Sequence, residues 1–150
     1  MNREELAYQY HEQGFNCCQA VVAAFSDVTG LTEQQALAVG GGFGGGMRCG
    51  EVCGAISGAI MVLGMANPYV DNTDAQSKKR IANLTREFHK RFKALFTYMR
   101  CTDLLRADFA SGALPQGATA AQKGNRCAGF VCTAVRLADE MLEEEKQGLL

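Results

Sequence analysis

Hydrophobic residues recur along this chain at intervals of three and four residues, the spacing of one face of an α-helix. Alternating runs of Val, Ile and Thr, which are typical of strands, are missing. The pattern therefore predicts an all-α fold. Its clearest part is the stretch 75–99, with a heptad-like series at Ile81, Leu84, Phe88, Phe92, Leu95 and Met99.

Capping residues and glycines divide the pattern into separate helices. Asn16 and Gln19 have the spacing of a capping box, in which each side chain accepts from the backbone N–H of the other residue. Thr32 and Gln35 have the same capping-box spacing, and Asn125 precedes the last hydrophobic series in the N-cap position. The predicted helices are a short first helix ending near Gly14, then 16–29, 32–39, 53–64, 75–99, 101–106 and 126–146, with a loop over 109–124.

The segment from Val52 to Val70 carries no charged residue and is rich in Gly and Ala. Only about 15 largely apolar residues precede Asn67 and Pro68, whereas a membrane span needs about 20. We therefore predict no membrane span and interpret 53–64 as a helix buried on all sides. The other helices are expected to pack around it as one single-domain helical bundle over residues 1–150.

Glycine is concentrated in two places. Six of the seven residues from Gly40 to Gly46 are glycine, and the run contains the nucleotide-binding pattern GxGxxG. That pattern works after a strand, which is missing here, so we interpret the run as a turn that passes close to another backbone segment. Gly54 and Gly58 form a small-xxx-small face, which favours close packing within the chain. The alternative is a homodimer through this face or through the series Ile81–Met99.

Charge and cysteine content narrow the function classes. With 15 basic and 16 acidic side chains, the net charge of -1 favours neither nucleic acid nor an anionic membrane as partner. The N-terminal residues lack the hydrophobic segment of a signal peptide. The seven cysteines are an odd number and cannot all pair within one chain. We therefore expect a cytoplasmic protein with reduced thiols.

Four of the cysteines lie at or near the start of a predicted helix. There, free backbone N–H groups and the positive end of the helix dipole stabilise a thiolate and lower the pKa of the thiol. Arg100 and Arg126 directly precede two of the four and are expected to add to this effect. The four candidate residues are Cys17, Cys53, Cys101 and Cys127.

The three remaining cysteines fit this arrangement less well. Cys49 precedes Cys53 by four residues, so it is a candidate resolving partner if the helix begins before Cys49. Cys18 points about 100° away from Cys17 around a helix. Cys132 is expected to pack in the core.

Familiar cysteine and histidine motifs are missing. The sequence contains no Cys-x-x-Cys, which excludes a thioredoxin-like site and a zinc ribbon, and no haem-attachment Cys-x-x-Cys-His. HExxH is also missing, and of the two histidines, His11 and His89, the second is expected on a charged helix face. No Cys–His pair for nucleophilic catalysis can be argued from the sequence.

A set of short motifs occurs in a fixed order along nearly the whole chain. The motifs are Gly14-Phe15-Asn16-Cys17, Gly41-Gly42-Phe43-Gly44-Gly45-Gly46-Met47, Cys53-Gly54-Ala55-Ile56-Ser57-Gly58, Arg91-Phe92, Cys101-Thr102-Asp103-Leu104-Leu105, and Cys127 with Val131. With these motifs in this order the chain resembles the C-GCAxxG-C-C family of redox-active proteins, which is bacterial or archaeal and has some members with selenocysteine.

The resemblance implies that Cys17, Cys53, Cys101 and Cys127 are the family cysteines and that the other three are additions of this chain. The family is also similar to a domain of split-Soret cytochromes, which bind haem and an iron centre. This chain lacks their haem-attachment motif, which argues against haem.

Three hypotheses follow. In the first, the four family cysteines cluster at one end of the bundle and cycle between thiolate and disulfide with an unidentified redox partner. The chain would then be a thiol–disulfide oxidoreductase, with Cys53 as its most reactive thiol and Cys49 as a local partner. In the second, the same four thiolates bind zinc or an iron–sulfur cluster. In the third, the chain is a structural helical dimer with buried, inert thiols.

Overall fold

The structure, a computed structural model, describes residues 1–107 and 125–150, and the loop predicted over 109–124 lies outside these ranges. The described residues form helices without a strand, which confirms the all-α prediction. Whether the chain is one domain stays a prediction. The helices are α1 (Arg3–Glu12), α2 (Cys17–Ala24), α3 (Ser26–Thr29), α4 (Glu33–Gly40), α5 (Gly54–Ala66), α6 (Ala75–Phe96), α7 (Cys101–Arg106) and α8 (Arg126–Lys146).

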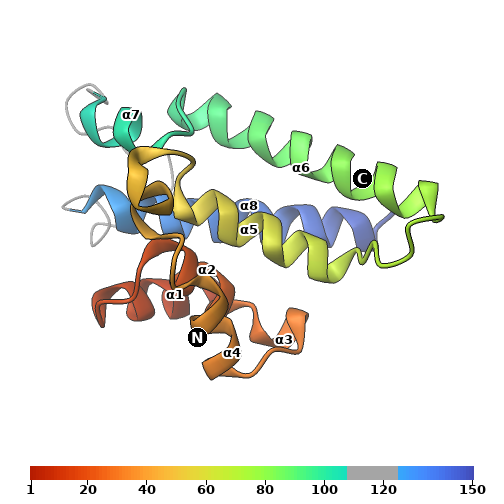
Figure 1. Cartoon of the computed structure of the whole chain (residues 1–150), viewed down its shortest axis with the longest axis horizontal. Coiled ribbons are helices and arrows are strands. Elements are labelled where there is room, and N and C mark those ends of the chain that lie inside the picture. The colour runs from red at the N-terminus through yellow and green to blue at the C-terminus, as the bar shows by residue number, and fades with distance from the viewer. Residues whose placement is uncertain (108–124) are drawn as a thin grey trace.

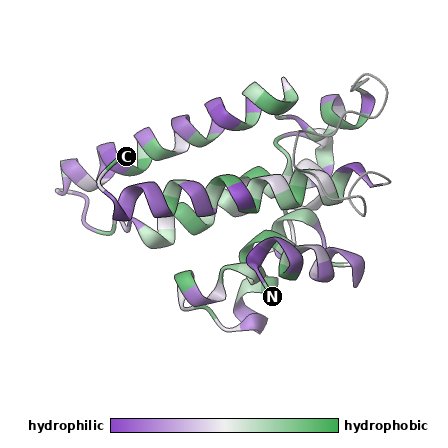
Figure 2. Ribbon diagram, turned by 180° about the vertical axis from the view of Figure 1, so that it is seen from behind, coloured by the Kyte–Doolittle hydropathy of each residue, from purple (hydrophilic) through white to green (hydrophobic). Residues whose placement is uncertain are grey.

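Helix α5 lies at the centre, in contact with α2, α3, α6 and α8 (Figure 1). The sequence-predicted bundle around the Gly/Ala-rich helix is thus confirmed. On the far side of α8 and α5 from α1–α4 lies α6, whose outer face is largely hydrophilic (Figure 2). Its inner face carries Phe92 and Phe96, which pack against Phe130 of α8, with the Phe96 and Phe130 ring centroids 4.9 Å apart.

The predicted capping residues begin the helices as expected. Both boxes, Asn16 with Gln19 and Thr32 with Gln35, are formed, and Asn125 accepts from the Ala128 N–H at 3.2 Å. The first helix starts with a further box that we did not predict, made by Asn2.

The helix predicted over 16–29 is interrupted. It breaks at Phe25 into α2 and α3, and the Ser26 hydroxyl donates to the Ala23 carbonyl at 3.0 Å. A side chain that donates a hydrogen bond to a backbone carbonyl oxygen competes with the backbone N–H of the next helical turn for that oxygen. This competition accounts for the break.

Two further boundaries differ from prediction. Helix α6 ends at Phe96, where Thr97 adopts a φ of 70°, so Met99 lies beyond it. Leu95, which was predicted to face inward, is 45% exposed. Phe96 is buried in its place, because the buried series Leu84, Phe88 and Phe92 continues in steps of four residues. The prediction that 53–64 is buried on all sides holds for residues 53–56 and is wrong further along, where Ser57, Ile60, Met61 and Gly64 are only half-buried.

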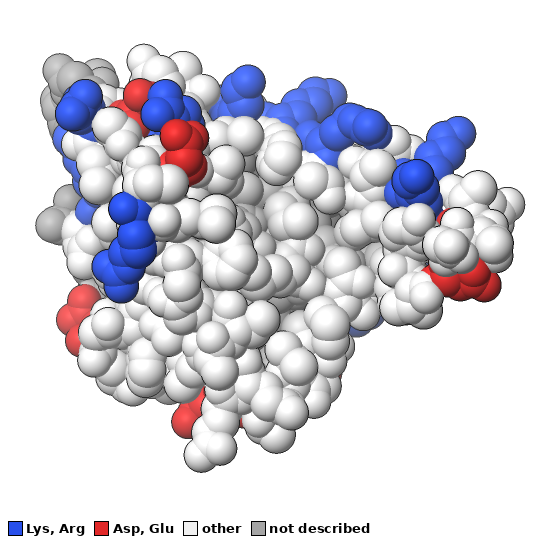
Figure 3. Space-filling model, in the orientation of Figure 1, with Lys and Arg blue, Asp and Glu red and all other residues white. Residues whose placement is uncertain are grey.

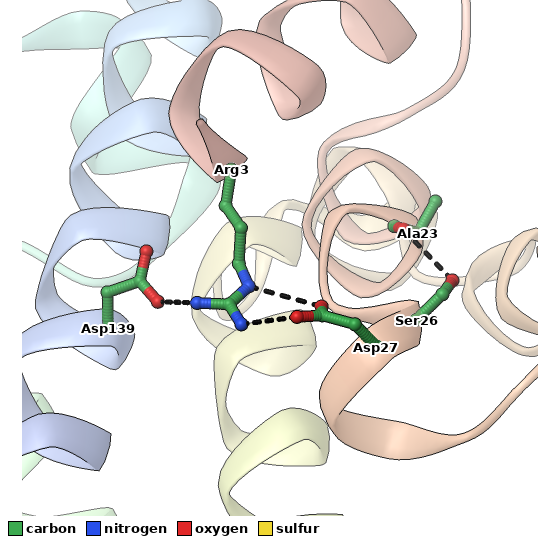
Figure 4. A network of polar contacts seen from close by, with 5 residues as sticks. All are labelled: Arg3, Ala23, Ser26, Asp27 and Asp139. Atoms are coloured by element: carbon green, nitrogen blue, oxygen red, sulfur yellow. Dashed lines mark hydrogen bonds and ion pairs between the residues drawn. The ribbon is translucent and has the colours of Figure 1, made fainter. Parts of the chain in front are cut away.

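An arginine ties the N-terminal helices to α8. Arg3 lies between Asp27 of α3 and Asp139 of α8 and forms ion pairs with both carboxylates (Figure 4). Its Nε also donates to Asp27 at 3.2 Å, and its guanidinium lies 5.0 Å from the centre of the buried Phe25 ring. The kink at Phe25 is therefore held against α1 and α8. In the described part of the chain, no helix is long and apolar enough to span a membrane.

Candidate functional site

The N-terminal ends of α2 and α5 lie in direct contact because glycine occupies the contact positions of α5. A Cβ at Gly54 would lie 2.8 Å from the Phe43 carbonyl oxygen and 3.1 Å from the Cys18 nitrogen. A Cβ at Gly58 would lie 3.0 Å from the Cβ of Val21. Contacts below about 3.0 Å are overpacked and force the backbone to move. Glycine at these positions thus sets how near Cys17 comes to α5.

The glycine run after α4 packs against the start of α2, as the close-packing interpretation predicted. Besides its capping bond to Gln19, Asn16 donates from its side-chain amide to the carbonyl oxygens of Gly40 and Gly41, at 3.2 and 3.1 Å. A Cβ at Gly40 would lie 2.9 Å from the Gln19 nitrogen. This second role of Asn16 was missed in the sequence, where only its N-cap spacing gives a signal.

A short backbone pairing brings Cys53 and Cys101 together. Val52 and Arg100 form an isolated antiparallel bridge, with Cys53 N–H donating to the Met99 carbonyl at 2.8 Å and Cys101 N–H to the Glu51 carbonyl at 2.7 Å. In extended backbone, neighbouring side chains alternate between faces. Cys53 and Cys101 each follow a bridging residue and therefore lie on one side of the pairing.

All four predicted cysteines lie at helix starts, as the sequence indicated. Cys17 and Cys101 are the first residues of α2 and α7, and Cys127 is the second residue of α8. Cys53 is the N-cap residue of α5 and is only 3% exposed, whereas the other three are half-buried. None of the chain's seven cysteines is in a disulfide.

Three of these thiols interact and form a trio, with Cys17 as the shared partner. Side-chain interaction with Cys127 and Cys53, together with burial, raises the pKa of the Cys17 thiol strongly. The interaction of Cys17 with Cys127 lowers the pKa of Cys127 to about 7. The separate interaction of Cys17 with Cys53 lowers the pKa of Cys53, helped by the backbone N–H groups of Ala55 and Ile56, although Cys53 makes no regular capping hydrogen bond.

Cys101 lies at the edge of the trio. Burial raises the pKa of its thiol, and negative charge on Cys53 and Cys127 raises that pKa further. The prediction of lowered thiol pKa at helix starts is therefore right in direction for Cys53 and Cys127 and wrong for Cys17 and Cys101. For these two, burial and neighbouring sulfurs outweigh the helix dipole, whose effect is below about 1 kcal/mol in most settings.

The two arginines expected beside the thiols have other partners. Arg100 forms an ion pair with Glu51 at 3.3 Å. Arg126 donates to the carbonyl oxygens of Leu104 and Leu105 at 3.4 and 3.2 Å, and to that of Ala107. Arg126 thus joins the end of α7 to the start of α8, where Cys127 lies.

Cys49 is not part of the trio. Helix α5 begins at Gly54, so the condition for Cys49 to reach Cys53 along a helix is not met. Cys49 lies in the turn Gly46–Gly50, is exposed, and donates to the Gly46 carbonyl at 3.4 Å. Cys18 and Cys132 are fully buried, and the Cys18 sulfur lies 3.9 Å from the sulfur of Met61. The core packing predicted for Cys132 is confirmed.

Metal binding by the four cysteines stays a prediction. Thiolates suit zinc and iron–sulfur clusters, which four cysteines hold around a common centre. Within residues 1–107 and 125–150, no three His, Cys, Asp or Glu side chains are placed to hold one ion. Cys17 interacts with both Cys53 and Cys127, as a thiol that exchanges a disulfide bond with either of them would.

The two faces considered for a homodimer are occupied within the chain. Gly54 and Gly58 pack against α2. In the series 81–99, Leu84, Phe88 and Phe92 are buried in the chain's own core. Both faces thus pack largely inside the bundle, and a homodimer stays a prediction.

The fold and the thiols define an all-α protein with cysteines grouped at helix N-termini. The chain belongs to the family described as "Putative redox-active protein (C_GCAxxG_C_C)", whose sequence model matches residues 15–141. This confirms the resemblance found in the sequence and gives the chain a redox role in general terms. No curated protein and no solved structure matches the chain. Bacterial origin and cytoplasmic location stay predictions.

Proposed function

We propose that this protein exchanges electrons with partner disulfides through its own thiols, with Cys127 as nucleophile and Cys17 as resolving thiol. The observation that supports this is the meeting of Cys53, Cys17 and Cys127 at the starts of α5, α2 and α8, where a Cβ at Gly54 would lie 3.4 Å from the Cys17 Cβ and Cys17 lowers the pKa of the other two thiols. The thiolate is the attacking species, and the optimum attacking thiol has a pKa near ambient pH. A pKa of about 7 meets that condition at Cys127.

Exposure favours Cys127 as the nucleophile over Cys53, which the sequence analysis expected to be the most reactive thiol. Cys53 is 3% exposed, so an external disulfide has little access to its sulfur. Cys127 is half-buried at the start of α8 and can meet a partner without unfolding the site. We therefore assign Cys53 a role inside the site, as the neighbour that accepts the Cys17 proton.

The partner disulfide is reduced in two exchange steps. The Cys127 thiolate attacks a partner disulfide, forms a mixed disulfide and releases the first partner thiolate. Cys17 then passes its proton to the Cys53 thiolate, attacks the Cys127 sulfur, and releases the second partner thiolate. Two thiols of this chain are oxidised to one Cys17–Cys127 disulfide, and one partner disulfide is reduced to two thiols.

Reaction of the reduced protein with bis(2-hydroxyethyl) disulfide under anaerobic conditions tests this proposal. Wild-type protein should lose two thiols and release two equivalents of 2-mercaptoethanol. Cys17→Ser should stop at a mixed disulfide on Cys127 with one equivalent released. Cys49→Ser, which removes an exposed thiol outside the trio, should behave as wild type.

Three results would contradict the proposal. The first is a mixed disulfide that accumulates on Cys49 in place of Cys127. The second is Cys17→Ser protein that still closes an intrachain disulfide at the wild-type rate. The third is anaerobically purified protein with visible absorbance and stoichiometric iron, or with bound zinc, since this would assign the thiols to metal binding.

A further inference from the structure

A hollow of about 720 Å³ lies between the C-terminal half of α5 and the pair α3–α4, away from the thiols at the start of α5. Its walls include Val39 of α4 and Met61, Gly64 and Met65 of α5. Pockets that bind small molecules have volumes of about 300–1,000 Å³. The hollow is therefore of the size that takes a small organic molecule.

The lining of the hollow carries no charged side chain. Val22, Leu31 and Ala38 complete its apolar wall, and methionine adapts its shape to irregular ligands. The molecular face that carries α4 and α5 is almost free of Lys, Arg, Asp and Glu, whereas basic residues line α6 (Figure 3). A charged ligand would find no counter-ion here, so the lining selects for a neutral molecule.

Two polar side chains in the wall offer hydrogen-bond donors. The Gln35 side-chain oxygen accepts from the Thr32 N–H at 3.0 Å, which leaves its NH₂ group without a partner in the described chain. Thr29 Oγ1 accepts from the Leu31 N–H at 3.2 Å, which leaves its O–H free to donate. A few placed polar groups in an apolar pocket orient a ligand. Donors without charge suit a carbonyl oxygen.

The exposed apolar surface at the hollow is too small for a protein partner. Among the lining residues, the large exposed hydrophobics are Val39 at 49% and Met65 at 46%. A stable interface buries about 800 Å² on each partner, with a hydrophobic centre. Two exposed side chains at the rim of an open hollow fall short of that.

From these observations we propose that the hollow between α3–α4 and α5 binds a neutral, mostly apolar molecule that carries a carbonyl group. Gly64 leaves the space for it, because a Cβ at this position would meet nothing within 4 Å. The proposal does not depend on the thiol chemistry, and Met61 separates the site from Cys18.

Nile red, a neutral apolar dye with a ring carbonyl, serves as the probe. Wild-type protein should enhance its fluorescence saturably with one site per chain. Gly64→Leu fills the hollow from within α5 and should weaken binding about tenfold or more, because an occupied cavity tolerates little added volume. The matched control is Gly42→Leu, at an exposed glycine that also has open space around its Cβ and lies outside the hollow.

Specificity is tested by displacement of Nile red with undecan-2-one and with decanoate, which have similar chains but differ in charge. The ketone should displace the dye more strongly. Gln35→Glu keeps the capping box but removes the amide donors, so it should weaken ketone binding about fivefold, the value of one hydrogen bond.

The proposal fails if wild-type protein binds no dye or if Gly64→Leu binds it like wild type. It also fails if decanoate competes as well as the ketone. Sedimentation adds one more decisive result: a wild-type dimer that Gly64→Leu dissociates would assign the hollow to a second copy of the chain. Thiol oxidation of Gly64→Leu should stay at the wild-type level, which separates this test from that of the redox proposal.

Discussion

The two ends of α5 carry the same kind of residue with opposite consequences. At its start, Gly54 and Gly58 are pressed against α2, with backbone and Val21 atoms where a side chain would begin. Near its end, Gly64 faces open space. The first end holds the thiols together and the second leaves a hollow. A glycine in a buried helix therefore marks either a close contact or a vacancy, and only the neighbouring helix decides which.

Substitution at the tight end should have the largest effect. Gly54→Ala places a Cβ against the backbone of Phe43 and Cys18, which cannot rotate away. We expect the free energy of unfolding to fall by about 2–3 kcal/mol, from overpacking reduced by the better helix propensity of alanine. Urea unfolding measures it, and an unchanged or higher stability would show that α2 does not press on α5.

Asn16 should come next, because it both caps α2 and holds the glycine run. Asn16→Ala removes the cap and the two bonds to Gly40 and Gly41, which should cost about 2 kcal/mol. Asn16→Asp keeps a capping oxygen but loses the donor, so it should cost about half as much. Equal unfolding free energies for the two variants would contradict the second role of Asn16.

The thiols at the tight end should differ in their pH dependence. Cys127 has a lowered pKa of about 7, so its thiolate fraction and alkylation rate should rise about tenfold between pH 6 and pH 8. Cys101 has a raised pKa and should react only at higher pH. Iodoacetamide labelling followed by peptide mass spectrometry separates the two sites. Cys101 labelling that precedes Cys127 as pH rises would contradict this ordering.

The smallest effect is expected at the open end. Gly64→Ala meets no atom within 4 Å and improves helix propensity, so the free energy of unfolding should rise by about 0.5–1 kcal/mol. The same Gly→Ala change thus has opposite signs at Gly54 and Gly64. A destabilised Gly64→Ala protein would mean that α4 or α3 packs more closely on α5 than the structure describes.

The sequence predicted what depends on local residues. Caps at Asn16, Thr32 and Asn125 predicted three helix starts. The spacing of hydrophobic residues predicted that α6 is a helix with one hydrophobic face. Because caps fix helix starts, the positions of Cys17 and Cys127 after Asn16 and Asn125 were also predictable, whereas α5 and α7, which begin beside Cys53 and at Cys101, have no side-chain cap. The kink at Phe25 was not, since it depends on one hydroxyl bond made by Ser26.

What depends on tertiary contact could not be predicted. Helix position alone suggested lowered pKa at Cys17 and Cys101, but the direction at these two is set by burial and by neighbouring sulfurs from other helices. The spacing of Cys49 and Cys53 suggested a local pair, yet the left-handed residues Met47 and Arg48 form a turn that ends before α5. That Cys17 is the shared partner of Cys53 and Cys127 could not be predicted, because it depends on how α2, α5 and α8 pack together.

The most direct test of the thiol arrangement is to map the disulfides that form when reduced wild-type protein is oxidised with diamide and digested without reduction. The account predicts that Cys17 takes part in every intrachain disulfide, with Cys127 as its main partner and Cys53 as its second. A dominant Cys49–Cys53 disulfide, or any major intrachain disulfide without Cys17, would contradict it.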